Sequence, residues 1–184
     1  FLGIASNSSL WESLQSSMAR HVAAVALLST AACGCLLQQH GSHAVADCSA
    51  MGLGVNGSQG LVEQLKELGA VESLTLGLRH DGLSEDLERL AEQLAKLTSL
   101  VALTISLDGN DIGDAGIDTL AEALRQLSGL ESLTLSLQYN SIHAAGAGTL
   151  GAALAKIPTL RELDLELKFN SLRSAGAGGL LQGL

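Results

Sequence analysis

The side chains best suited to chemistry in this sequence are five histidines and three cysteines, and few of them are spaced so that they could act together. His40 and His43 follow a long apolar stretch at helical spacing, which makes them candidates for binding a metal ion or the central ion of a chlorophyll. The competing interpretation is that they are ordinary polar residues at a helix end. Serine, histidine and aspartate all occur, but no pattern brings them together as a catalytic triad. We therefore expect neither catalysis nor a resident cofactor or metal ion.

The cysteines and the glycine-rich segments also have structural interpretations. Cys33, Cys35 and Cys48 match neither the count nor the spacing of a zinc site or a disulfide framework, so we expect packed or free thiols. The glycines within 144–148 are not followed by the Lys-Ser or Lys-Thr of a phosphate-binding loop. We expect them to serve a turn and the start of a helix.

The charge of the chain limits its partners. The formal net charge is -9 and the isoelectric point is near 4.8. A cationic stripe that could neutralise phosphates is missing from the sequence, which argues against nucleic acid as a partner. It argues equally against binding to an anionic membrane surface through charge alone.

A repeated pattern of leucines organises the second half of the chain. The five-residue runs 74–78, 103–107, 133–137 and 163–167 each place leucine or isoleucine at alternate positions, at intervals of 29 or 30 residues. Three residues after each run stands a short polar side chain, and two residues later an aliphatic one: Asp81, Asn110, Asn140 and Asn170, then Leu83, Ile112, Ile142 and Leu172. Alternation within each run has the period of a strand, and the leucines that follow have the period of a helix.

This pattern resembles the ribonuclease-inhibitor class of leucine-rich repeats over residues 53–184. The resemblance implies an α/β solenoid of about four repeats over 74–184, with parallel strands inside, helices outside and a hydrogen-bonded ladder of asparagines. Residues 44–73 fit a degenerate capping repeat. Two departures from the family pattern stand out: each strand carries an extra Leu-x pair, and Asp81 replaces the first asparagine, so the ladder would begin at Asn110.

The N-terminal segment, residues 1–43, has a different character. From His21 to Ala46 the sequence holds no formally charged residue, and 22–37 is nearly continuous apolar. Sixteen residues at about 1.5 Å each reach roughly 24 Å, a little short of a ~30 Å hydrocarbon core, and Arg20 could lengthen the span by snorkelling. We predict an interfacial helix over 9–18 and a single transmembrane helix over about 19–37, packed against other helices through Ala26, Thr30 and Gly34. A buried helix, or one that caps the solenoid, is the alternative.

Candidate partner-binding residues lie where the strands end. Side chains between the leucines are small and polar, whereas larger ones follow each run: Arg79, Asp108, Gln138 and Lys168, then His80, Tyr139 and Phe169. Aromatic residues and arginine most often anchor interfaces, so Tyr139 and Phe169 are the main candidates. The uncharged helix over 144–155 and the end of the chain at Leu184, without a polar cap, indicate that a partner or further sequence covers that end.

Together these observations predict a non-catalytic, membrane-anchored accessory or assembly subunit of a larger photosynthetic or respiratory complex. It would lie in a thylakoid or mitochondrial inner membrane, with the solenoid on the side opposite the N-terminus, because Arg20 and Asp47 flank the apolar segment. The start at Phe1 rather than Met fits a processed chain. The alternative is a soluble recognition protein that regulates a partner enzyme, as the family resemblance implies.

Overall fold

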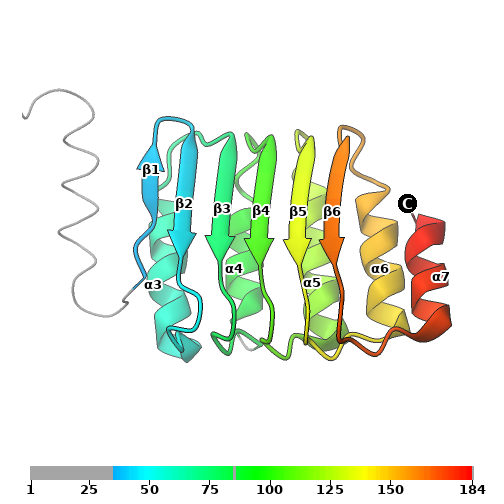
Figure 1. Ribbon diagram of the computed structural model, residues 1–184. Helices are drawn as coiled ribbons and strands as arrows, with labels where there is room; N and C mark the ends of the chain where they lie inside the picture. Colours follow the sequence, from blue (N-terminus) through cyan, green and yellow to red (C-terminus); the bar gives the residue numbers. More distant parts are fainter. Residues whose placement is uncertain (1–34, 85, 184) are drawn as a thin grey trace, which may run out of the picture. The chain divides into compact units, whose positions relative to one another are not determined.

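The computed structural model describes residues 35–84 and 86–183, and its centre is one six-stranded sheet (Figure 1). The strands follow one another across the sheet in chain order. The first pair is antiparallel and every later pair is parallel. The strands are β1 (Gln38–His40), β2 (His43–Asp47), β3 (Ser73–Gly77), β4 (Ala102–Ser106), β5 (Ser132–Ser136) and β6 (Glu162–Glu166).

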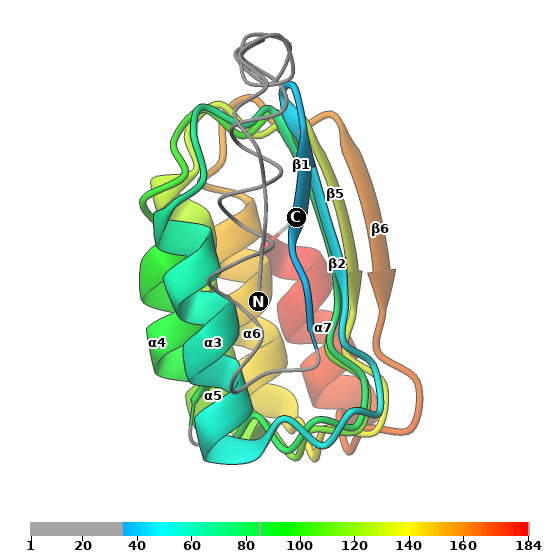
Figure 2. The ribbon, with the colours of Figure 1, turned by 90° about the vertical axis from the view of Figure 1, so that its left-hand side faces the viewer.

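Helices connect the parallel strands and cover one face of the sheet, as Figure 2 shows. The other face, called the open face below, carries no described helix. The helices are α3 (Gly54–Lys66), α4 (Leu87–Leu94), α5 (Gly113–Gln126), α6 (Ala144–Leu154) and α7 (Arg173–Gly183).

Alternation along the strands produces the two faces. Leu74, Leu103, Leu133 and Leu163 are register partners across β3 to β6, and the first three are at most 1% exposed. Because successive side chains point to opposite faces, this row meets the helices, and the polar residues between the leucines line the open face. Leucines of the helices, such as Leu90 and Leu120, complete one apolar layer between sheet and helices.

A ladder of buried asparagines supports the turns that follow the strands. The Asn140 Oδ1 atom accepts hydrogen bonds from the backbone N–H groups of Asn110 (3.0 Å) and Ile112 (3.3 Å) in the preceding turn. Its Nδ2 atom donates to the carbonyls of Leu107 (2.8 Å) and Gln138 (3.1 Å). Asn110 and Asn170 make equivalent bonds, so each asparagine joins two turns. The ladder begins at Asn110, as the family resemblance implied.

The small residues of α6 allow a close approach to α7. A Cβ atom added at Gly151 would lie 2.5 Å from the backbone oxygen of Leu180, and one added at Gly176 would lie 3.1 Å from the Cα atom of Ala144. Contact between the two helix backbones therefore accounts for the uncharged, glycine-rich sequence of this region. No covering partner is needed to explain the small residues of α6.

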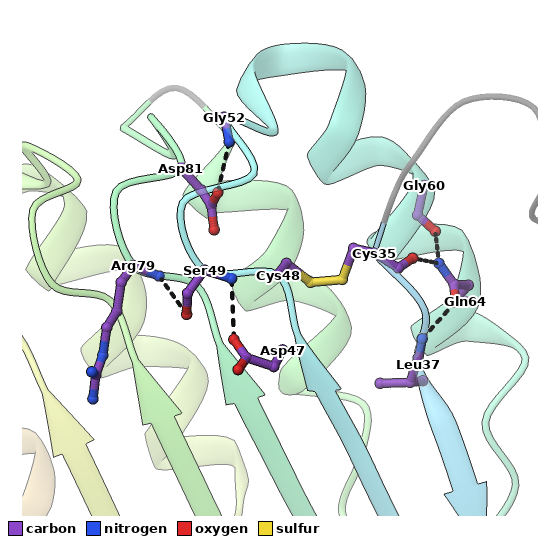
Figure 3. The surroundings of a disulfide bond; sticks show 10 residues. All are labelled: Cys35, Leu37, Asp47, Cys48, Ser49, Gly52, Gly60, Gln64, Arg79 and Asp81. Carbon is purple, nitrogen blue, oxygen red and sulfur yellow. Dashed lines mark hydrogen bonds between the residues drawn. A yellow bond between two sulfur atoms is a disulfide. The ribbon is translucent and has the colours of Figure 1, made fainter.

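A disulfide joins the two sides of the β1–β2 hairpin, and the expectation that these cysteines are packed or free thiols was wrong. Cys35 precedes β1, Cys48 follows β2, and their sulfur atoms are bonded (Figure 3). Gln64 of α3 holds the same segment by donating from Nε2 to the Cys35 carbonyl (3.2 Å) and accepting from the Leu37 N–H at Oε1 (2.8 Å). The third cysteine, Cys33, lies outside the described residues.

The prediction of a transmembrane helix over 19–37 was wrong. Cys35 and Leu37 are non-helical and belong to the core beside the sheet. The longest described helix, α5, has 14 residues and so reaches about 21 Å, and no helix in the described part of the chain is both long and apolar enough to cross a membrane. The predicted membrane location is corrected with it. The residues predicted to pack this helix, Ala26, Thr30 and Gly34, and the predicted interfacial helix over 9–18 lie outside the described residues.

The solenoid prediction is also corrected. The observed architecture is an α/β fold with a single, mostly parallel six-stranded sheet whose first strand is antiparallel. Leucine spacing fixes the alternation of strand and helix within each 29- or 30-residue unit. It does not fix how successive units are arranged relative to one another, because that depends on sheet twist and on the separation of the two layers.

Replacing Asn140 with alanine should destabilise the fold strongly. Asn140 is fully buried, and its loss leaves two N–H groups and two carbonyls with fewer partners. At roughly 1–3 kcal/mol for each unsatisfied buried group, we expect a loss of about 3 kcal/mol or more in the free energy of unfolding, measured by urea denaturation. The exposed Gln126→Ala variant is the control. A loss below about 1 kcal/mol for Asn140→Ala would show that the ladder is not a major source of stability.

Removing the disulfide should also destabilise the fold, and chemical reduction should reproduce the effect. Cys35 and Cys48 are 13 residues apart, a loop whose closure contributes about 3 kcal/mol by restricting the unfolded chain. The double Cys35→Ser, Cys48→Ser variant should therefore unfold at a lower urea concentration than the oxidised protein and at nearly the same concentration as the reduced one. Identical midpoints for all three samples would contradict this.

Candidate partner-binding surface at the ends of the strands

The residues that follow the strands share an unusual backbone conformation. His80, Gly109, Tyr139 and Phe169 occupy equivalent positions and have φ angles of 57°, 68°, 54° and 58°. This left-handed conformation costs a non-glycine residue roughly 1–2 kcal/mol. Backbone hydrogen bonds between neighbouring turns hold it, from the His80 N–H to Asp108 O (2.8 Å) and from the Tyr139 N–H to Lys168 O (3.2 Å). The backbone at these positions is therefore held by its neighbours in the sheet.

Tyr139 and Phe169 form a stacked pair on the surface, called the aromatic pair below. Their ring centroids are 4.3 Å apart and the ring planes are inclined by 9°. The two residues are nevertheless 54% and 67% exposed. Stacking uses one face of each ring, so a large apolar area stays in contact with solvent. The structure thus brings together the two residues that the sequence singled out as anchors.

His80 and Gly109 continue the same row on the side of β3 and β4. A Cβ atom at Gly109 would collide with the imidazole ring of His80, so the ring occupies the space above this glycine. Any side chain at position 109 would displace the histidine. Gly109 also has a positive φ, which only glycine adopts without cost.

Arg79, Asp108 and Gln138 belong to a polar network at the same ends of the strands. The Arg79 Nε atom lies 3.2 Å from Asp108 Oδ2. The Ser136 hydroxyl and the Gln138 backbone N–H donate to Asp108 Oδ1 at 2.5 and 2.9 Å. Asp108, which the sequence analysis named as a candidate partner-binding residue, is only 7% exposed, and its carboxylate is occupied by Arg79, Ser136 and Gln138.

Gln138 and Lys168 lie next to the aromatic pair in sequence. The Gln138 side chain donates to the carboxylate of Glu166 and to the Ser136 hydroxyl (3.5 Å). Lys168 is exposed, and its backbone oxygen accepts the Tyr139 N–H bond. Both residues are thus placed where a partner held by the aromatic pair could contact them.

His40 and His43 are brought together in another place. They are register partners across the tight turn between β1 and β2, and both are exposed. Within the described residues, no group of three or more histidine, cysteine or acidic side chains could hold a metal ion. His40 and His43 were candidate pigment or metal ligands because the sequence placed them at the end of a helix. In the structure they lie in strands, so the argument for a ligand at a helix end does not hold.

Asp81 stands where the asparagine ladder would continue, and it is almost fully buried. Its Oδ1 atom accepts the Gly52 N–H bond (3.1 Å), but its Oδ2 atom is buried without a hydrogen-bond partner (Figure 3). At the equivalent place Asn110 has an NH₂ group that donates to carbonyls. Burial raises the pKa of Asp81, and the charge of Asp47 acts more weakly in the same direction.

Three carboxylates lie together on β6, and the sequence alone did not predict this group. Glu162, Asp164 and Glu166 alternate with leucines and so share the open face. Their register partners on β5 are Ser132, Thr134 and Ser136. The signal was in the sequence as Glu-Leu-Asp-Leu-Glu in place of Ser-Leu-Thr-Leu-Ser, but only the strand register shows that the three acids lie together at one edge.

In comparisons with known proteins, no family model matches the chain, and no curated protein is significantly similar to it in sequence.

Replacing Asp81 with asparagine should stabilise the protein increasingly as the pH rises. Because the pKa of Asp81 is raised in the fold, its stabilising contribution is complete below the ordinary carboxyl pKa and is lost as the pH rises through the folded-state value. The asparagine variant lacks this loss and supplies an N–H donor. We expect it to exceed the wild type by about 1 kcal/mol at pH 7 and by less at pH 4.

The measurement is urea denaturation across this pH range, with the exposed Asp118→Asn substitution as the control for a lost negative charge. A difference between wild type and Asp81→Asn that does not change with pH would contradict a raised pKa of Asp81 in the folded protein.

Proposed function

We propose that this protein is a non-catalytic recognition module that binds another protein at the open face, next to the ends of the strands. The observation that carries the proposal is the exposed aromatic pair, Tyr139 and Phe169. Tyrosine and other large aromatic side chains dominate the binding energy of protein interfaces, and two stacked rings bury a large apolar area when covered.

The rigidity of this surface supports the same function. Interfaces lose affinity when flexible side chains must be ordered on binding. Here the backbone of both aromatic residues is fixed in the left-handed region, and the stack restricts the rings. Asp108 and its hydrogen bonds hold the neighbouring strand ends in place. Much of the ordering cost is therefore already met in the folded protein.

The repeat pattern is a second source of support. The asparagine ladder and the regular leucine register resemble those of leucine-rich-repeat proteins, in which recognition of other proteins is the usual function. We infer from this residue pattern that the chain is related to that family. The resemblance favours protein binding over catalysis.

Substituting both aromatic residues should remove partner binding without unfolding the chain. Asparagine tolerates positive φ better than other non-glycine residues, so Tyr139→Asn and Phe169→Asn keep the backbone conformation while deleting the rings. We expect at least one protein captured from native cells by the wild type to be lost, by about tenfold or more, with the double variant.

Val101→Ser is the matched control, since Val101 is 40% exposed and precedes β4 at the opposite end of the strands. Capture is quantified by mass spectrometry, and thermal melting verifies that each variant is folded. An unchanged set of captured proteins for the double variant would overturn the proposed site.

A further inference from the structure

A groove runs between α5 and α6, which pack side by side on the face of the sheet that the helices cover (Figure 1). It encloses about 240 Å³ and is lined by one stripe of residues from each helix. Because residues three and four apart share one face of a helix, the groove follows both helix axes. The α5 stripe is Asp118, Ala121, Glu122 and Arg125, and the α6 stripe is Thr149, Ala152, Ala153 and Lys156.

Small side chains make this groove hollow. Ala121 and Ala153 form its floor and are 2% and 4% exposed. Ala152 and Thr149 on the α6 side are exposed but short. At the position equivalent to Ala152, α5 carries the longer Glu122. The contact of α6 with α7 involves its glycines, whereas the Ala152 side chain lines the groove shared with α5. An apolar side chain from outside can therefore cover the two floor alanines.

The charges around the groove are ordered along its length. Asp118 stands nearer the amino ends of the two helices, and Arg125 and Lys156 stand at their carboxyl ends. Glu122 accepts from Arg125 Nη1 (2.8 Å) and Gln126 Nε2 (3.0 Å). Within residues 35–84 and 86–183, neither Asp118 nor Lys156 belongs to an ion pair. The groove thus changes from negative to positive over about 10 Å.

This order of charges fits an α-helix in one direction. α5 and α6 run the same way, because each follows a strand of the parallel part of the sheet. A helix favours acidic side chains in its first turn and basic ones in its last turn, since both compensate its dipole. In antiparallel orientation its acids would meet Arg125 and Lys156, and its bases would meet Asp118. A strand would find no backbone partners here, because side chains of two helices line the groove.

We propose that the groove between α5 and α6 binds an amphipathic α-helix of a partner protein, antiparallel to both helices, with a leucine or methionine over Ala121 and Ala153. The inference goes beyond the proposed function, because that function uses the strand ends and the open face, whereas the groove lies among the helices. The protein then has a second, separate binding surface. Apolar anchors at helical spacing are the usual means by which a helix is held in a groove.

The probe is a capped, alanine-rich peptide of about 20 residues, because shorter isolated helices are marginal in water. Its binding face carries glutamates in the first turns, two leucines four residues apart at the centre and lysines in the last turns. The control peptide has the glutamates and lysines exchanged, and circular dichroism measures the helicity of both. Binding to the full chain is followed by fluorescence anisotropy. We expect the first peptide to bind and the control to bind about tenfold more weakly.

Ala152→Glu tests whether the peptide occupies the groove. It gives α6 the side chain that α5 carries at the equivalent position, so the fold should tolerate it, which thermal melting verifies. The carboxylate would lie where the peptide places its leucines, and covering a charge without a partner is unfavourable. We expect binding to weaken by about tenfold or more. The matched control is Ala145→Glu, an exposed position of α6 outside the groove. Equal weakening by both variants would overturn the proposal.

Exchanging the charges of the groove tests the direction of the helix. The double variant Asp118→Lys, Lys156→Glu keeps the net charge of the chain. Its preference between the two peptides should narrow or reverse relative to that of the wild type. Because each peptide is compared across two proteins, a difference in helicity between the peptides does not affect this result. An unchanged preference would overturn the antiparallel orientation, and no binding of the first peptide to the wild type would overturn the proposal as a whole.

Two further outcomes separate this inference from the proposed function. The Tyr139→Asn, Phe169→Asn variant should bind the first peptide as the wild type does. Loss of binding would show that the peptide occupies the aromatic pair, and would overturn the groove site while leaving the proposed function intact. Concentration-dependent association of the wild type in sedimentation experiments, abolished by Ala152→Glu, would assign the groove to a second copy of this chain and would also overturn the proposal.

Discussion

At the carboxyl end of each parallel strand the chain turns toward a helix, and its backbone N–H and carbonyl groups there are shielded from water by the neighbouring turns. Each such group costs free energy if it stays unpaired, and the asparagine side chain is suited to the task because it both accepts and donates. Asn110, Asn140 and Asn170 accept from the turn before and donate to carbonyls around them. The regular spacing of the strands, the closed leucine layer and the shape of the open face all depend on these bonds.

The same constraint positions the candidate binding surface. Turns joined to one another by the ladder favour the left-handed backbone at Gly109, Tyr139 and Phe169, one residue before each ladder asparagine. A conformation that would be unfavourable in isolation is maintained because the adjoining bonds over-determine it. Rings of the aromatic pair are stacked in solvent for this reason, and not because a core surrounds them. The proposed partner recognition would therefore use a backbone conformation that arises from the hydrogen bonds between the turns.

The sequence predicted the parts of the structure that depend on local spacing. Alternate leucines indicated the strands, and the resemblance to leucine-rich repeats implied their parallel arrangement and the asparagine ladder that starts at Asn110. It failed where a property depended on distant residues: the apolar segment up to Leu37 was interpreted as part of a membrane helix, although Cys35 and Leu37 pack beside the sheet. Similarly, Tyr139 and Phe169 were singled out by type, but their stacking follows from the strand register. The burial of Asp108 and the common position of the β6 acids at one edge of the sheet also could not be predicted without the strand register.

The disulfide has a consequence for the order in which the sheet can be assembled. Cys35 and Cys48 enclose a hairpin of adjacent residues, whereas each later strand pairs with one that is 29 or 30 residues away in the chain. Closing a short loop loses less entropy than closing a long one, so the hairpin can be oxidised before β3 to β6 have been synthesised. Once closed, β2 offers a fixed edge on which β3 can align. In an oxidising compartment the chain would thus acquire its first template strand by a covalent step, ahead of the cooperative packing of the leucines.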